Sequence, residues 1–147
     1  MGRVIQMNII IPGVYDLFHE GHKKLIQYGS FINGEDKIII VINSSELCEL
    51  NGKKIKESDE VRVQRVEKYL AHKKIEAEVV LISKIDDTIK IALENSPCFW
   101  LTGRDWNLKT TSVRNRIKET FWESNNIYLI YKDRVPHISS TKLRGKR

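Results

Sequence analysis

Short apolar runs alternate with longer amphipathic stretches along this chain. Runs such as Ile38–Ile42 are typical of strands covered on both faces, and apolar residues three and four apart predict helices. We expect strands at Val4–Ile11, Lys37–Ile42, Ala77–Ile82, Cys98–Thr102 and Ile127–Tyr131. A polar loop of about fifteen residues follows the second strand. We expect helices at Gly21–Phe31, Ser58–His72, Asp86 or Asp87 to Glu94, Ser112–Trp122, and from about Ser139 onward.

Strands and helices that alternate with short links predict an α/β fold with a doubly wound parallel sheet. A chain of 147 residues has the usual size of one domain, so we expect a single domain spanning 1–147. Ligands of such sheets bind at the carboxyl ends of the strands, where the strand order reverses. Residues that can bind or react with a ligand, and that directly follow a strand, are therefore the first candidates for a ligand-binding site.

The composition limits the classes of protein to which this chain can belong. No apolar run approaches the length of about 18 residues that a membrane span needs, and the first residues show no leader pattern. Cys48 and Cys98 lack metal-ligand spacing, and nothing indicates a disulfide framework. We therefore expect a cytoplasmic protein with free thiols and no membrane partner.

The net charge of +6 suits anionic ligands, and nucleic acid is one of them. The basic tail Lys142–Arg147 is the best support for a nucleic-acid-binding or catalytically silent nucleotide-binding module. Against it, the other basic residues are dispersed and no module of stacking aromatic residues is visible. Small phosphorylated ligands are the better fit.

The segment Gly13–His22 carries the most specific chemistry. It follows a predicted buried strand and leads into a predicted helix. His19 and His22, three residues apart at a helix N-terminus, lie on one face. Free N–H groups and the helix dipole attract phosphate there, and two imidazoles can donate further hydrogen bonds to its oxygens. Gly21 between them leaves space for a ligand to approach the backbone.

This segment has the pattern G-x-[FY]-D-x-x-H-x-G-H and resembles the signature of the nucleotidyltransferase superfamily. The long form is similar to the cytidylyltransferase branch, typified by glycerol-3-phosphate cytidylyltransferase. The resemblance extends from about Val4 to Arg144 and implies a Rossmann-like sheet of five strands in the order 3-2-1-4-5. It implies catalytic roles for His19 and His22. It also implies nucleotide-binding roles for Gly13, Val14, Tyr15, Asp16 and Gly21.

A second segment, Ile138–Arg144, resembles the family signature I-S-[ST]-T-x-[IL]-[RK]. Its hydroxyl residues are N-cap types, and with free N–H groups they make another anion site. Arg134 stands at the spacing that the family uses for a phosphate-binding arginine, so the resemblance gives it a catalytic role. Residues 135–137 read V-P-H where cytidylyltransferases usually have T-E-G, a departure that bears on the nucleotide and the substrate. The implied nucleotide-binding residues are Ile138, Ser139, Ser140 and Thr141.

A softer resemblance follows the fourth strand, where Gly103–Trp106 is similar to the family's G-[DE]-D-[WY] loop. Arg104 occupies the first acidic position, so three residues carry over as candidate nucleotide contacts: Gly103, Asp105 and Trp106. A partly buried aromatic residue is an equally good reading of Trp106.

A lysine loop follows the second strand. Lys53 aligns with the family's catalytic, acceptor-binding lysine, and Lys54 and Arg62 with further substrate-binding positions. Without the other motifs, this segment would read as a solvated basic loop. The family's second arginine aligns with Leu70 here, so one phosphate contact is missing or is supplied by Arg65.

The resemblance implies a cytidylyltransferase that transfers CMP from CTP to a small phosphorylated alcohol, similar to glycerol 3-phosphate, and releases pyrophosphate. The alternative is an adenylyltransferase of the same superfamily that uses ATP and flavin mononucleotide, phosphopantetheine or a sugar phosphate. The phosphate nucleophile is largely ionised at pH 7, so no general base is required. Positioning and charge stabilisation then supply the catalysis.

The resemblance also implies Mg²⁺ as cofactor and a homodimer. Asp16 and Asp105 are candidates for Mg²⁺ or ribose contacts, since Mg²⁺ needs few protein ligands when phosphates supply the rest. Asp16 has a second reading, in which it caps the histidine-bearing turn. Both readings of Asp16 stay open at this stage.

Overall fold

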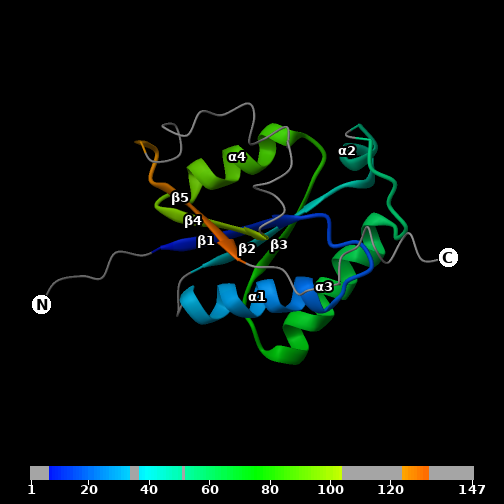
Figure 1. The fold of residues 1–147 in the computed structure, drawn as a ribbon, viewed down its shortest axis with the longest axis horizontal. Coiled ribbons are helices and arrows are strands. Elements are labelled where there is room, and N and C mark those ends of the chain that lie inside the picture. Colours follow the sequence, from blue (N-terminus) through cyan, green and yellow to red (C-terminus); the bar gives the residue numbers. More distant parts are fainter. Residues whose placement is uncertain (1–6, 34–36, 51, 104–123, 133–147) are drawn as a thin grey trace, which may run out of the picture.

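A parallel sheet forms the centre of the computed structural model, which describes residues 7–33, 37–50, 52–103 and 124–132 (Figure 1). The strands follow the order β3-β2-β1-β4-β5, and all four pairings are parallel. The predicted α/β fold and its order 3-2-1-4-5 are therefore confirmed, with the switch between β1 and β4. The strands are β1 (Asn8–Gly13), β2 (Ile38–Asn43), β3 (Glu78–Ile82), β4 (Cys98–Gly103) and β5 (Ile127–Lys132).

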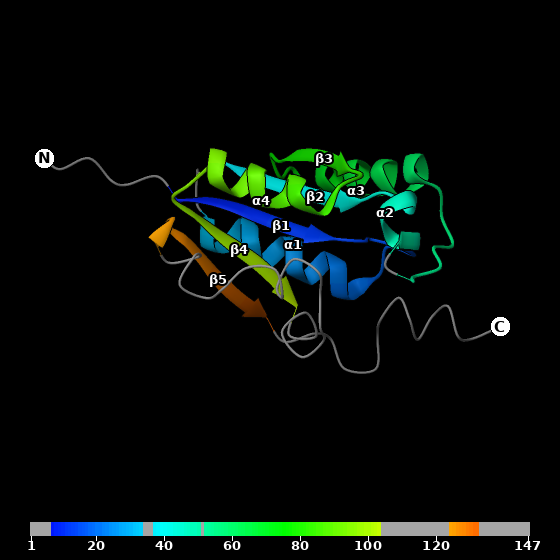
Figure 2. The ribbon, with the colours of Figure 1, turned by 90° about the horizontal axis from the view of Figure 1, so that it is seen from above.

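Helices cover both faces of this sheet (Figure 1, Figure 2). On one face lie α1 (Glu20–Asn33) and α3 (Asp59–Lys73), and on the other lie α4 (Ile85–Glu94) and the short α2 (Ser45–Leu50). Alternate residues of the central strands point to opposite faces. Ile9 and Ile11 of β1 pack in the cluster with α1 and α3, whereas Ile10 packs in the cluster with α4. This two-sided burial explains why the central strands are apolar at nearly every position.

The predicted elements that the structure describes are present, with ends that differ by at most four residues. The first strand continues to Gly13, two residues past the predicted end, so the histidine motif begins inside the strand. Ser58 is the N-cap of α3 and not its first residue, because its hydroxyl oxygen accepts a hydrogen bond from the Val61 N–H at 3.2 Å. The helix predicted at 112–122 and the helix predicted after 139 lie outside the described residues.

The polar loop predicted after β2 is partly wrong, because α2 begins there. The Ser44 hydroxyl accepts a hydrogen bond from the Leu47 N–H at 3.1 Å, which caps the first turn. Leu47 and Cys48 are both buried. Leu47 packs on the α4 side of the sheet, and Cys48 lies beside β2. Two buried apolar side chains in a six-residue helix are too few to produce a visible helical period, so the sequence pattern does not predict this element.

No helix within the described ranges combines the length and the apolar character needed to cross a membrane.

Candidate active site

His19 and His22 cap the N-terminus of α1 reciprocally. His19 precedes the helix, and its Nδ1 accepts a hydrogen bond from the Gly21 N–H at 3.0 Å. His22, in the first turn, accepts a hydrogen bond on Nδ1 from the His19 N–H at 3.2 Å. The arrangement is that of a capping box in which imidazoles replace the usual hydroxyl and carboxylate. The predicted helix start is confirmed, and both rings lie on it side by side, with centroids 3.9 Å apart.

This capping assigns the tautomer of both rings. An imidazole nitrogen that accepts a hydrogen bond carries no proton, so in the neutral ring the other nitrogen carries it. Because backbone N–H groups occupy Nδ1 of both His19 and His22, each neutral ring has its proton on Nε2. The pair therefore offers two N–H donors from the positive end of α1. Such donors suit the oxygens of a phosphate.

His22 is held neutral by its surroundings. Its ring lies 5.1 Å from the Tyr15 ring and stacks on Phe18, with centroids 5.8 Å apart and planes 9° apart. The pKa of His22 is lowered to about 3, mainly by burial and also by the nearby His19, while Asp16 acts in the opposite direction. At physiological pH, His22 is therefore a hydrogen-bond donor without a charge.

Gly21 makes room for the His19 ring. A Cβ atom at this position would lie 2.8 Å from His19 Cε1 and 3.0 Å from its Nδ1. We expected this glycine to leave space for a ligand. In the structure the space above it is filled by the imidazole, so the glycine is needed for the histidine to fold back over the helix start.

The segment between β1 and the histidines has an unusual backbone. Tyr15 and Leu17 have φ of 58° and 53°, in the left-handed region that large residues rarely adopt. Tyr15 is buried, and its hydroxyl donates to the Ile11 carbonyl oxygen at 3.0 Å. A Cβ atom at Gly13 would lie 3.0 Å from Tyr15 Cε2. Gly13 and Tyr15, both predicted nucleotide contacts, thus serve first to build this turn.

Asp16 fastens the same turn to the loop that precedes α3. It is fully buried, and its carboxylate accepts hydrogen bonds from the N–H groups of Lys56 at 3.1 Å and Glu57 at 3.0 Å. Of the two readings of Asp16, this geometry supports a structural role, although the N–H groups that Asp16 caps belong to the loop before α3 and not to the histidine-bearing turn itself. Among the described residues there is no group of three His, Cys, Asp or Glu side chains that could hold a metal ion. A metal role for Asp16 remains a prediction.

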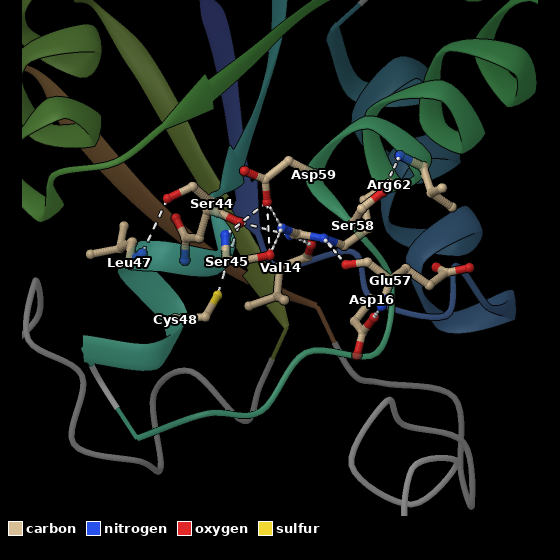
Figure 3. Close-up of polar contacts among 12 residues, drawn as sticks. Val14, Asp16, Ser44, Ser45, Leu47, Cys48, Glu57, Ser58, Asp59 and Arg62 are labelled. Carbon is tan, nitrogen blue, oxygen red and sulfur yellow. Dashed lines mark hydrogen bonds and ion pairs between the residues drawn. The ribbon is translucent and has the colours of Figure 1, made fainter.

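Arg62 lies at the centre of a buried polar cluster (Figure 3). Its side chain has no exposed area, and its five N–H groups donate hydrogen bonds to five acceptors that surround it. These are the carbonyl oxygens of Glu57, Val14 and Asn43, the Ser45 hydroxyl and the Asp59 carboxylate. The structure thus gives Arg62 a structural role in place of the direct substrate contact that the sequence predicted. Val14, predicted to bind nucleotide, supplies a carbonyl to this cluster.

Lys53 and Lys54 are exposed in the loop that follows α2. The Lys53 N–H donates to the Cys48 carbonyl oxygen at 2.9 Å, which fixes the start of the loop. Both lysines follow β2 at the carboxyl edge of the sheet, the edge at which the histidine pair also lies. Gly103 ends β4 at this edge, and a Cβ atom there would meet no atom of the described residues within 4 Å. Beyond the described residues lie Asp105, Trp106, Arg134, Ile138, Ser139, Ser140 and Thr141.

Leu70, where the family has a second arginine, is a buried member of the core cluster on the α1 and α3 side. Arg65, the proposed substitute, is half exposed, and its Nε lies 2.7 Å from a carboxylate oxygen of Glu57. Glu57 is a site residue that the sequence does not predict. Its side chain is largely buried and contacts the histidine-bearing turn, but no spacing or motif marks a glutamate in a polar loop as a partner of that turn.

The two thiols are buried, Cys48 close to the Arg62 cluster (Figure 3) and Cys98 at the start of β4. Both are free. Burial raises the pKa of both, to about 11 for Cys98. Thiols in this state are poor nucleophiles at neutral pH.

Comparisons with known proteins agree with this architecture. Two solved structures match nearly the whole chain at low identity, which shows a shared fold. A lipopolysaccharide core biosynthesis protein from Thermoplasma volcanium GSS1 is 16% identical with a TM-score of 0.63, covering 90% of this chain and 98% of that one. A protein with unknown function from Archaeoglobus fulgidus is 19% identical with a TM-score of 0.65, covering 90% and 94%. No curated protein matches the sequence.

The histidine pair, the lysine loop and all of the sheet except the first two residues of β1 fall within residues 10–146, which match a family model described as cytidylyltransferase-like. That match covers most of the chain. The protein therefore belongs to the cytidylyltransferase-like family and is an enzyme of the nucleotidyltransferase type.

Proposed function

We propose that this enzyme transfers CMP from CTP to a small phosphorylated alcohol, similar to glycerol 3-phosphate. The observation that carries the proposal is the histidine pair, in which both Nδ1 atoms accept hydrogen bonds from backbone N–H groups, so that each neutral ring has its donor proton on Nε2 at one helix N-terminus. A nucleotide α-phosphate seated there would receive these hydrogen bonds as negative charge grows on its oxygens. Donors fixed in advance at the place where charge develops are the most effective kind of stabilisation.

The proposed reaction needs no general base to remove a proton from the nucleophile. A phosphate oxygen of the acceptor attacks the α-phosphorus of CTP, a new P–O bond forms, and the bond to the β-phosphate oxygen breaks. Pyrophosphate leaves with the electron pair of that bond. The acceptor's phosphate has a second pKa of about 6, so the attacking oxygen is already ionised. A neutral His22 suits this scheme, because it donates a hydrogen bond and has no need to accept a proton.

In this proposal, the positively charged side chains form two groups, and each group binds one of the two substrates. Lys53 binds the phosphate of the acceptor, with Lys54 beside it, since both are exposed at the carboxyl edge of β2. Arg134 and the segment 138–141 bind the β- and γ-phosphates by resemblance to the family signature. At Gly103 no described residue would contact a Cβ atom, and we propose that a nucleotide base or ribose approaches the backbone there.

Mg²⁺ remains part of the proposal. The described residues do not form a protein cage for it, and Asp16 is buried with both carboxylate oxygens engaged. The ion would therefore be carried mainly by the nucleotide's phosphates, which is common for Mg²⁺. A homodimer is likewise proposed on the resemblance alone.

The experiment is pyrophosphate release with CTP or ATP and a panel of phosphorylated acceptors. Glycerol 3-phosphate is the first acceptor, and glycerol is its matched control without phosphate. We expect release with CTP and glycerol 3-phosphate, dependence on Mg²⁺, and none with glycerol. Release that requires ATP would move the enzyme to the adenylyltransferase branch, which residues 135–137 leave open. Absence of release with every pair would refute the proposal.

A further inference from the structure

The histidine-bearing turn and the lysine loop hold each other through two carboxylates. Asp16, in the turn, accepts hydrogen bonds from the N–H groups of Lys56 and Glu57 at 3.1 and 3.0 Å. Glu57, in the loop, accepts a hydrogen bond on Oε1 from the Leu17 N–H at 2.9 Å. Each acid thus caps the backbone of the opposite segment. We call this reciprocal pair the Asp16–Glu57 clasp.

The clasp is largely buried, its carboxylates accept hydrogen bonds from backbone N–H groups, and the Glu57 charge is paired. Asp16 has no exposed area, and the Glu57 side chain is 12% exposed. The second Glu57 oxygen pairs with Arg65 Nε at 2.7 Å. Arg62 adds a hydrogen bond to each side, at the carbonyl oxygens of Val14 and Glu57. A buried carboxylate that is fully hydrogen-bonded and paired is stable, whereas its loss leaves buried N–H groups without acceptors.

The clasp lies between the two groups that the reaction must bring together. Leu17 is two residues before His19, and Lys56 is three residues after Lys53. The turn itself relies on outside support, because Tyr15 and Leu17 both hold a left-handed backbone. Figure 3 shows Asp16 and Glu57 side by side, with Arg62 reaching to the same segment. The position of the lysine loop relative to the histidines is therefore set by this contact.

We infer that Glu57 is a positioning residue, which fixes the lysine loop, and with it the phosphate of the acceptor, against the histidine pair. The inference rests on the proposed function for the identity of that phosphate. Glu57 itself touches none of the reacting groups. Its effect comes from geometry, since displacing a substrate by about 1 Å can cost up to about 10²-fold in rate.

Three variants test this inference in the full-length enzyme. Glu57→Ala removes the acceptor of the Leu17 N–H, and Glu57→Gln keeps an oxygen there while losing the charge. Glu60→Ala is the matched control, because Glu60 is exposed and has no hydrogen bond or ion pair among the described residues. We expect Glu57→Ala to lower kcat/KM for the acceptor by about 10–10²-fold and leave the KM for the nucleotide within about twofold. Glu57→Gln should recover most of the loss, and Glu60→Ala should match the wild type.

A second readout does not depend on turnover. Amide hydrogen exchange should be faster at Leu17 in Glu57→Ala, and the increase should extend into the lysine loop, at Lys53 and Lys54. If Glu57→Ala leaves exchange in that loop unchanged, or lowers turnover with both substrates in proportion to lost folded protein, the inference is wrong. If the exchange spreads as expected but no acceptor gives pyrophosphate, the coupling stands and the proposed function fails.

Discussion

Replacing His22 should remove a pH dependence of folding stability. Burial lowers the pKa of His22 from 6.5 to about 3 in the folded protein. Between these two values the unfolded chain binds more protons than the folded one, so stability is present above the unfolded pKa and is lost as the pH falls. Each pH unit inside this window is worth about 1.4 kcal/mol, which gives a loss of about 2 kcal/mol between roughly pH 7.5 and pH 5.0.

The assay is urea unfolding at these two pH values, followed by circular dichroism, on the wild type and on His22→Gln. The wild type should lose about 2 kcal/mol more than the variant on acidification. His72→Gln is the control, since His72 is exposed in the last turn of α3 and its removal should leave the wild-type behaviour intact. If the wild type and His22→Gln lose the same unfolding free energy on acidification, His22 is not buried as a neutral ring. That result would contradict its assignment as a neutral hydrogen-bond donor.

Three further substitutions address the site. His19→Ala should lower kcat by about 10²–10³-fold with the fold intact, the cost of one preorganised donor, and near-normal turnover would remove His19 from the mechanism. Gly21→Ala should lower kcat with little change in melting temperature, because its Cβ would lie 2.8 Å from His19 Cε1 and displace that ring; unchanged turnover would contradict this account of the glycine. Lys53→Ala should raise the KM for the acceptor more than the KM for the nucleotide, and a uniform effect on both would refute the division of phosphate sites.

The sequence was sufficient to predict the sheet and the place of the histidines. Apolar runs of four to six residues and a specific ten-residue motif are local signals, and β1, β2 and α1 lie where those signals are strongest. The short α2 was missed, because its burial depends on contacts with the sheet that six residues do not encode.

The roles of individual site residues were harder to predict. Arg62 sits in a motif position expected to face the substrate, yet its partners come from the segment after β1, from β2, from α2 and from the loop before α3. Only the folded chain brings those acceptors together. Glu57 acts across 40 residues of sequence separation from Leu17, which no local pattern records. Motif resemblance identifies which residues matter in a family, and geometry decides whether they contact the ligand or support a neighbour.

The left-handed backbone at Tyr15 and Leu17 has a consequence for how this segment tolerates sequence change. Glycine adopts such φ values freely, whereas a large residue there costs about 1–2 kcal/mol. Leu17 is partly exposed, so a library varied at this position should enrich glycine or asparagine among stabilised clones. Tyr15 should behave in the opposite way, because its ring is 1% exposed and supports His22. Two residues with the same backbone conformation, two positions apart, should thus accept very different substitutions.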